Sequence, residues 1–410
     1  MIVANSRYRP NPDRCIIIEG RIDEQLISRV TPSLLKLQKS PEPITAYILN
    51  SPGGAVNVME ALLRLFRSPN QNFSPVNRVI TVVTKKAASA AADLLCSGDY
   101  AIAYPDSIIH YHGGRVYEEG ALTKERTTLL ADYLRWTSDY YAWDLARKIE
   151  ARFRLLFLLS RDRFAEVRSK HAPQRMSDFE CFLDIVMEKL SRNGKKVCEA
   201  ARDRYKRYEV LLDKIPRRPK SKRQRPAVLE ADQIKVILDF ELDANKKNRQ
   251  WTFRYNGLSQ VTEDFHLLTE FLDTKHDDRL KQWCSQFGQF ALNPTEKAAM
   301  DAIADEKLRT EKMAELFGPI LEPVWSFFNA MCHALQEGEN QLTAKDAYWL
   351  GLIDEVMGDS DMSALRLIME YKEPPKEQDQ SAPKPTNEKK DAEQKTKTEQ
   401  AKNEDERPKA

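Results

Sequence analysis

The chain has 410 residues, of which 41% are hydrophobic and 31% are charged, so it is long enough for two or three domains with buried cores. Its 64 Lys and Arg residues nearly balance 62 Asp and Glu residues, which leaves a formal net charge of +2. The chain as a whole therefore has no charge excess that would direct it to nucleic acid or to an anionic membrane surface.

Six cysteines are scattered along the chain without the CxxC spacing of zinc ligands, which favours free thiols in a reducing compartment. The first residues lack the apolar region of a secretory signal peptide. No uncharged apolar run reaches the roughly 18 residues that a membrane helix needs. Together these features predict a cytoplasmic protein without a membrane span.

Strand and helix patterns alternate in the first part of the chain. Such alternation predicts right-handed βαβ crossovers and a mainly parallel sheet, with functional groups gathered where strands end and helices begin. The predicted strands are residues 15–19, 44–49, 77–84, 100–104 and 108–112. The predicted helices are one that Asp23 caps and that carries apolar residues from Leu26 to Leu37, with a kink or break at Pro32, a second at residues 56–66 and a short Ala-rich one after residue 86.

Ser89 is the first chemically suggestive residue, because it follows a predicted strand and opens an Ala-rich helix. Backbone N–H groups are unpaired in the first turn of a helix, and the helix dipole is positive there, so an oxyanion would be stabilised. Strand alternation puts His110 and His112 on one face. Taken alone, this serine fits ordinary helix packing. The two histidines fit a structural pair or part of a metal site, although no third ligand stands at metal-site spacing.

Later segments are mainly helical. Residues 123–149 predict one long helix. The basic stretch 214–225 predicts a solvated linker or, as the alternative, a patch for nucleic acid or an acidic partner, although no aromatic residues interleave to stack bases. The predicted organisation is an α/β core at residues 1–150, a mainly helical insertion at 151–319 with one strand at 234–242, a return to the core at 320–370 with a final helix and strand, and a disordered charged tail at 371–410.

Four motifs in a fixed order carry a family resemblance: Asn50–Gly54, Ala87–Ser89, Pro105–His112 and Gly351–Glu355. With these motifs, residues 14–150 and 340–357 resemble the Clp protease proteolytic subunit. The resemblance implies a ClpP/crotonase-like spiral fold, a serine endopeptidase that hydrolyses polypeptides, and assembly into homo-oligomeric rings. It also implies an AAA+ ATPase partner on another chain, because this chain lacks a GxxxxGK[ST] motif. No metal or organic cofactor is implied.

Matched position by position, the resemblance assigns Ser89 as nucleophile and His112 as general base, although a two-residue shift would select His110 instead. Gly54 and Ala90 match the residues whose backbone N–H groups form the oxyanion hole. The acid is assigned to Glu339, which stands where we align the family's aspartate. The remaining candidates for the acid are Asp162 and then Asn340.

Several positions depart from the family pattern. Lys85 and Lys86 replace Gly-Gln, and Ala91 replaces a glycine. Two cations near a catalytic histidine would lower its pKa, so a weakened or inactive oligomeric scaffold is a second hypothesis. A crotonase-type enzyme acting on a CoA thioester is a third, although the motifs favour it less. By resemblance, residues 123–149 correspond to the helix that joins two rings, and Tyr140, Tyr141 and Trp143 fit either an interface or a core.

Overall fold

The computed structural model describes residues 8–68, 77–115, 120, 123–170, 176–213, 241–245, 250–254 and 274–363. All the described residues belong to one compact unit within residues 1–367, and residues 368–410 lie outside the described residues. The predicted tail at 371–410, the basic stretch at 214–225 and most of the predicted strand at 234–242 also lie outside them.

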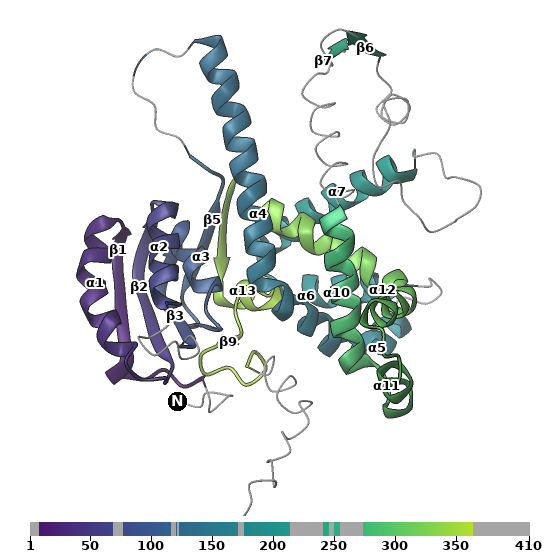
Figure 1. The fold of residues 1–410 in the computed structure, drawn as a ribbon, viewed down its shortest axis with the longest axis horizontal. Helices are drawn as coiled ribbons and strands as arrows, with labels where there is room; N and C mark the ends of the chain where they lie inside the picture. The colour runs from purple at the N-terminus through teal and green to yellow at the C-terminus, as the bar shows by residue number, and fades with distance from the viewer. Residues whose placement is uncertain are drawn as a thin grey trace, which may run out of the picture. The chain divides into compact units, whose positions relative to one another are not determined.

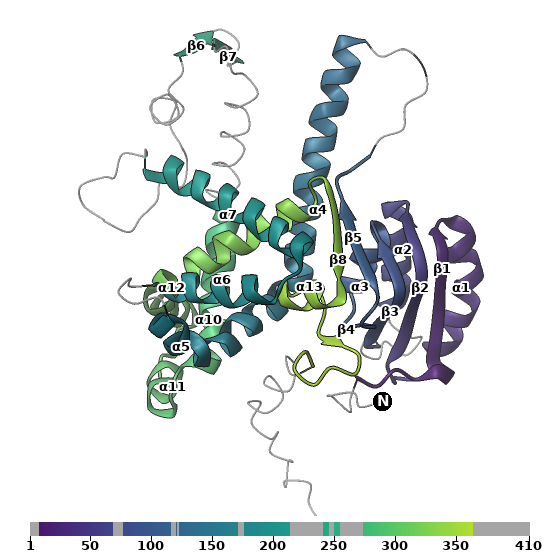
Figure 2. The same cartoon turned by 180° about the vertical axis from the view of Figure 1, so that it is seen from behind.

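The core is a mixed α/β structure around a sheet of mostly parallel strands, which confirms the predicted class (Figures 1 and 2). The strand order is β1-β2-β3-β4-β9, and β5 joins β3 to β8. Only the β5–β8 pair of this sheet is antiparallel. The strands are β1 (Cys15–Ile22), β2 (Ile44–Gly54), β3 (Val79–Ala88), β4 (Tyr100–Ala103), β5 (Ile108–His112), β8 (Glu339–Thr343) and β9 (Glu355–Val356).

Three helices cover one face of this sheet: α1 (Glu24–Leu37), α2 (Val56–Phe66) and α3 (Ala90–Cys96). The α1 helix packs on β1, and α3 packs on β2 and β3. Asp23 caps α1 by accepting a hydrogen bond from the Leu26 backbone N–H (3.0 Å). The helix continues through Pro32, where a kink or break was predicted. On the opposite face, Tyr8 stacks on Tyr100 with ring centroids 4.7 Å apart.

The β3 strand is longer than predicted and passes through both lysines instead of ending before them. It first pairs with β4, and from Lys86 onward it pairs with β5. The change of partner supplies new ladder hydrogen bonds, so the strand continues although lysine is a poor strand residue. Similarly, β2 extends beyond its predicted end at residue 49 and runs along β1 as far as Gly54.

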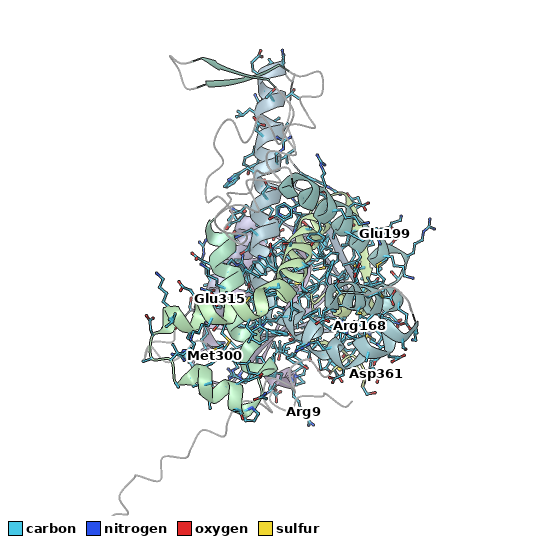
Figure 3. The ribbon with its side chains drawn as sticks, turned by 90° about the vertical axis from the view of Figure 1, so that its right-hand side faces the viewer. Arg9, Arg168, Glu199, Met300, Glu315 and Asp361 are labelled. Carbon is cyan, nitrogen blue, oxygen red and sulfur yellow. The ribbon has the colours of Figure 1, made fainter. Side chains whose placement is uncertain are left out.

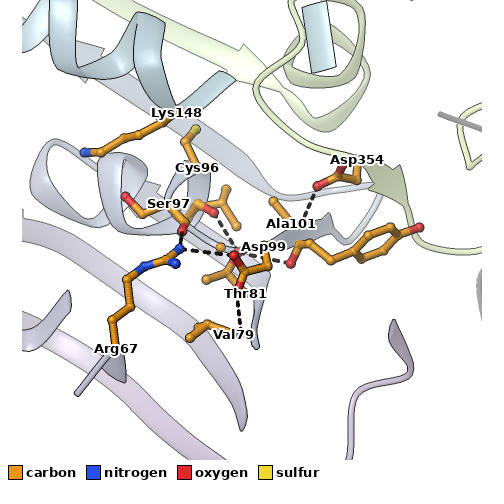
Figure 4. A network of polar contacts seen from close by, with 12 residues as sticks. Arg67, Val79, Thr81, Cys96, Ser97, Asp99, Ala101, Lys148 and Asp354 are labelled. Atoms are coloured by element: carbon orange, nitrogen blue, oxygen red, sulfur yellow. Dashed lines mark hydrogen bonds and ion pairs between the residues drawn. The ribbon is translucent and has the colours of Figure 1, made fainter. Parts of the chain in front are cut away.

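A buried arginine holds the C-terminal end of α3 in place. Arg152 Nε donates to the Asp354 carboxylate (2.8 Å), and its other nitrogens donate to the backbone carbonyls of Cys96 (2.9 Å) and Gly98 (2.7 Å). Asp354 also accepts a hydrogen bond from the Ala101 backbone N–H (2.8 Å), as Figure 4 shows. The Gly-Leu-Ile-Asp motif at residues 351–354 thus contributes a carboxylate that joins α3, β4 and the long helix α4 (Lys124–Ser160).

The α4 helix (Lys124–Ser160) extends well beyond the predicted end at residue 149, so the predicted domain boundary at 150 falls inside it. Its second half packs in an aromatic core with the helical segment that follows. Charged residues such as Glu199 and Glu315 cover the outside of that segment (Figure 3). The aromatic core includes Phe153, Phe157, Phe182, Trp283, Phe287, Trp325 and Phe328. The further elements are η3 (Arg161–Arg163), α5 (Phe164–Lys170), α6 (Asp178–Lys189), α7 (Arg192–Asp213), β6 (Glu241–Asn245), β7 (Gln250–Arg254), α10 (Thr274–Ala291), α11 (Pro294–Asp301), α12 (Glu306–Leu335) and α13 (Ala344–Trp349).

The helical segment is fastened to the sheet through Asp346, a fully buried residue at the start of α13. Its carboxylate accepts hydrogen bonds from the backbone N–H and the hydroxyl of Ser191, both at 2.7 Å. It also accepts from the backbone N–H (3.0 Å) and hydroxyl (2.8 Å) of Thr343, at the end of β8. One carboxylate therefore joins the entry of α7 to β8. None of the helices that the structure describes is long and apolar enough to cross a membrane.

Candidate active site

Ser89 occupies a sharp turn between β3 and α3, as the sequence predicts. Its φ of 53° and ψ of −130° make it the one non-glycine residue with positive φ in the described part of the chain. The Ser89 backbone N–H donates to the His110 carbonyl (2.7 Å) on β5. Ser89 stands at the N-cap position of α3, but its side chain makes no capping hydrogen bond. This arrangement leaves the hydroxyl available for chemistry at a strained strand-to-helix turn.

The two adjacent glycines of β2 meet different neighbours. A Cβ added at Gly53 would lie 2.7 Å from the Ser89 Cβ and 3.1 Å from the Ala90 backbone nitrogen, so Gly53 packs directly against the serine turn. A Cβ at Gly54 would lie 2.1 Å from the Ile22 carbonyl oxygen on β1. Both positions therefore exclude a side chain. Ala90 is the first residue of α3, where a backbone N–H has no partner within the helix.

His110 and His112 lie on the same face of β5, as predicted, with ring centroids 5.7 Å apart. His112 Nδ1 lies 2.8 Å from the Gly113 carbonyl oxygen. Because a carbonyl only accepts hydrogen bonds, we assign the proton of neutral His112 to Nδ1. Its Nε2 then carries a lone pair, which is the form that a general base requires.

Glu339 lies directly opposite His112 in the antiparallel β5–β8 ladder. Its carboxylate, however, pairs with His110 Nε2 (2.9 Å) and with Arg115. Burial lowers the pKa of His110, and the charges of His112 and Lys86 act in the same direction, whereas Glu339 opposes them. Desolvation raises the pKa of Glu339, but Arg115 and His110 together bring it below its ordinary value. Glu339 therefore stays ionised beside the histidine pair.

The serine turn, the glycine pair and the two histidines all lie on the first part of the chain, and a family model described as Clp protease matches residues 5–123. This segment belongs to the Clp protease family. The Clp protease match includes Ser89, Ala90, His112 and Gly54, whereas Glu339 lies outside it. None of the curated proteins matches the chain.

The two other candidates for the acid have different surroundings. Asn340 faces away from the histidines, because it pairs with Tyr111 in the ladder, and its amide donates to the carbonyls of Ala334 (3.0 Å), Leu335 (3.0 Å) and Glu337 (2.7 Å). It therefore caps the end of α12. Asp162 lies in η3, which packs against α4 and α5. Neither residue has a recorded contact with His110 or His112.

Two participants were not predicted from the sequence. Arg115 pairs with the Glu339 carboxylate oxygen that His110 does not contact, and the Gly113 carbonyl holds His112. Arg115 follows a Gly-Gly pair and carries no recognisable pattern, and a backbone carbonyl is invisible in any sequence. Among the described residues, no group of three or more His, Cys, Asp or Glu side chains is arranged to hold a metal ion.

Proposed function

We propose that the chain is a serine-type endopeptidase that cleaves polypeptides by acyl transfer. The observation that carries the proposal is the strained Ser89 turn, whose hydroxyl is not used for capping. It follows the strand that pairs with β5, and β5 carries an imidazole, His112, whose Nδ1 is held by a carbonyl. A strained turn persists where the surrounding structure enforces it, and such turns are concentrated at functional sites. The Clp protease match over residues 5–123 supports the same class of reaction.

In this mechanism, His112 Nε2 takes the proton of the Ser89 hydroxyl, and the Ser89 Oγ attacks the peptide carbonyl carbon. The carbonyl π bond opens, and the backbone N–H groups of Gly54 and Ala90 hold the resulting oxyanion. His112 then gives the proton to the leaving amine as the C–N bond breaks. Water, deprotonated by the same imidazole, attacks the acyl-enzyme and releases Ser89.

We assign the role of the acid to Glu339, whose carboxylate lies opposite His112 in the strand register and pairs with His110. In this arrangement, Glu339 supplies negative charge to the histidine pair as a whole, and the Gly113 carbonyl sets the orientation of His112. Replacing Glu339 with Gln removes the charge but keeps the hydrogen-bonding shape. We expect this variant to lower kcat with little change in KM.

A labelling experiment tests the proposed reaction. A fluorophosphonate probe should label the wild-type full chain, and Ser89→Ala should abolish labelling. His112→Ala should remove labelling and peptide turnover, whereas His110→Ala, the matched control on the same strand face, should retain part of both. The proposal fails if a fully folded wild-type chain takes no label, or if His110→Ala removes labelling and His112→Ala does not. Turnover of a CoA thioester without peptide cleavage would select the crotonase-type alternative.

The first half of α4 supports a homo-oligomer. Tyr141 is partly buried, but Tyr140 and Trp143 belong to an exposed stripe whose members recur at alternate spacings of four and three residues. This spacing matches the seam of a helix that pairs with another helix. The exposed fractions are 70% for Leu129, 52% for Tyr133, 64% for Trp136, 42% for Tyr140 and 40% for Trp143.

We infer that this stripe joins copies of the chain, as the ring assembly of the family implies. The same surface serves the alternative of a catalytically inactive scaffold, so its test is independent of activity. Trp136→Lys should reduce the mass measured by light scattering after size exclusion. The matched control Thr127→Lys, also exposed on α4, should leave the mass unchanged. An unchanged mass in both variants contradicts the inference. An ATPase partner remains an expectation from the family resemblance.

A further inference from the structure

Lys86 lies at an irregularity in the central strand of the sheet. Val83 pairs with Ile48 on β2, but the next recorded pairs on the two strands are Lys86 and Asn50. Three steps along β3 therefore match two steps along β2, which is the signature of a β-bulge. Bulges next to functional sites turn a side chain toward a new direction. This bulge is also the point where β3 leaves β4 and begins to pair with β5.

The ladder places the Lys86 side chain on the same face as the histidines. Lys86 pairs with Ile108 of β5, and Ala88, two residues later, pairs with His110. The alternate residues of β5 point toward α3, as the contact between the Tyr111 hydroxyl and the Cys96 sulfur (3.0 Å) demonstrates. Lys86 therefore lies one row of side chains, about 7 Å along the sheet, before the row that contains His110.

Among the residues that the structure describes, no carboxylate forms an ion pair with this cation. Lys86 is partly exposed, and no ion pair recorded among the described residues involves it. The nearby carboxylate of Glu339 is already engaged by His110 and Arg115. Partly buried positive charge beside a reaction site attracts anionic groups of a ligand, because fewer water molecules screen it. Ile108, which is 42% exposed, forms an apolar neighbour in the same row.

We propose that Lys86 is a specificity-determining residue that binds a carboxylate of the peptide substrate. The substrate class is then polypeptide segments with Asp or Glu close to the scissile bond. This inference rests on the proposed peptidase function and names its substrate. An extended peptide advances about 3.3 Å per residue, so one row of the sheet corresponds to about two peptide residues. The acidic residue therefore lies within about two residues of the bond that Ser89 attacks.

Binding and cleavage are measured separately, so that the inference and the peptidase function can fail independently. Fluorescein-labelled, Ala-rich peptides carry one Glu that is moved along the sequence, and each has a Gln counterpart. Fluorescence polarisation with the full-length Ser89→Ala chain should give about fivefold tighter binding for the best Glu peptide than for its Gln counterpart. Lys86→Gln in this background should remove the preference. The matched control Lys85→Gln, which removes the same charge one residue earlier, should keep it.

The same peptides measure turnover by the wild-type chain. Equal binding of all Glu and Gln pairs overturns the assignment of Lys86, and so does an equal loss of preference in the Lys85→Gln control. A preference that depends on Lys86 without any turnover supports the binding site and contradicts the hydrolase. Turnover without a preference for Glu supports the hydrolase and contradicts the binding site. Added salt should weaken a genuine preference, because it screens partly exposed charges.

Discussion

Replacing Ser89 with Gly should make the protein more stable than replacing it with Ala. The backbone of Ser89 has φ 53° and ψ −130°, a conformation that glycine adopts freely and that a residue with a Cβ adopts under strain. Alanine keeps the Cβ and the strain, whereas glycine removes both. Both variants lose the hydroxyl, so their difference isolates the backbone. The comparison therefore measures the strain at the turn without any contribution from catalysis.

The expected magnitude follows from two opposing effects. A residue held in such a sparsely populated region costs on the order of 1–3 kcal/mol. Glycine loses more conformational freedom on folding than alanine, which costs about 0.5–1 kcal/mol. The difference leaves Ser89→Gly more stable than Ser89→Ala by about 1 kcal/mol. Ala92→Gly, in the buried interior of α3, is the control of opposite sign, because it has no strain to relieve.

Urea denaturation followed by far-UV circular dichroism measures this difference, provided that the m-values of the variants agree. We expect a higher midpoint for Ser89→Gly than for Ser89→Ala, and a lower midpoint for Ala92→Gly than for the wild type. If Ser89→Gly is less stable than Ser89→Ala by the amount that Ala92→Gly loses, the turn is not strained. The argument that the fold holds the nucleophile in a strained backbone conformation would then be refuted.

Three further predictions concern buried charges. Burial raises the pKa of Asp93 from its ordinary value of 3.8 to about 6, so the folded protein favours the protonated carboxyl. The resulting contribution to stability is complete below pH 3.8 and is lost as the pH rises through about 6. From pH 4 to pH 8, the free energy of unfolding of the wild type should therefore fall by about 3 kcal/mol relative to Asp93→Asn. Arg152→Met and Asp354→Leu should each cost about 3–5 kcal/mol, and the double variant less than their sum, because each single change leaves one buried charge unpaired. Asp346→Ala should cost about 3 kcal/mol and speed proteolysis of the helical segment, whereas the exposed control Asp361→Ala should do neither.

Local patterns in the sequence predicted the elements that lead to the site. The Ala-rich stretch after a β-rich run placed Ser89 at a strand-to-helix junction, and period-two alternation placed both histidines on one face. These features depend on residues close together in the chain. The same is true of helix α2, whose predicted range of residues 56–66 agrees with the structure. Local periodicity was sufficient for α2 because the spacing of its buried residues and the turn residues before it indicate the same helix.

Local patterns did not predict the features that depend on partners distant in sequence. The extension of β3 through Lys86 needs β5 as a neighbour, and the antiparallel strand β8 needs the chain to return more than two hundred residues later. Similarly, α4 continues past residue 149 because the apolar surfaces of Phe153 and Phe157 find partners in the helical segment. A local stretch of sequence contains only one of the two partners in each of these interactions.

The two histidines have different hydrogen-bond partners, so their possible roles differ. His112 Nδ1 is held by a neutral carbonyl, which fixes the tautomer but stabilises an imidazolium less than a carboxylate would. The nearby negative charge is on Glu339, which bonds to His110 and is partly neutralised by Arg115. In serine proteases, the acid contributes about 10⁴-fold to kcat, whereas the oxyanion hole and substrate binding still act without it. Since the oxyanion donors proposed here belong to the backbone, side-chain differences such as Lys86 leave them intact. Rate would then depend mainly on how well the substrate is positioned, and Lys86, one row of side chains from His110, would contribute to that positioning in the proposal made above.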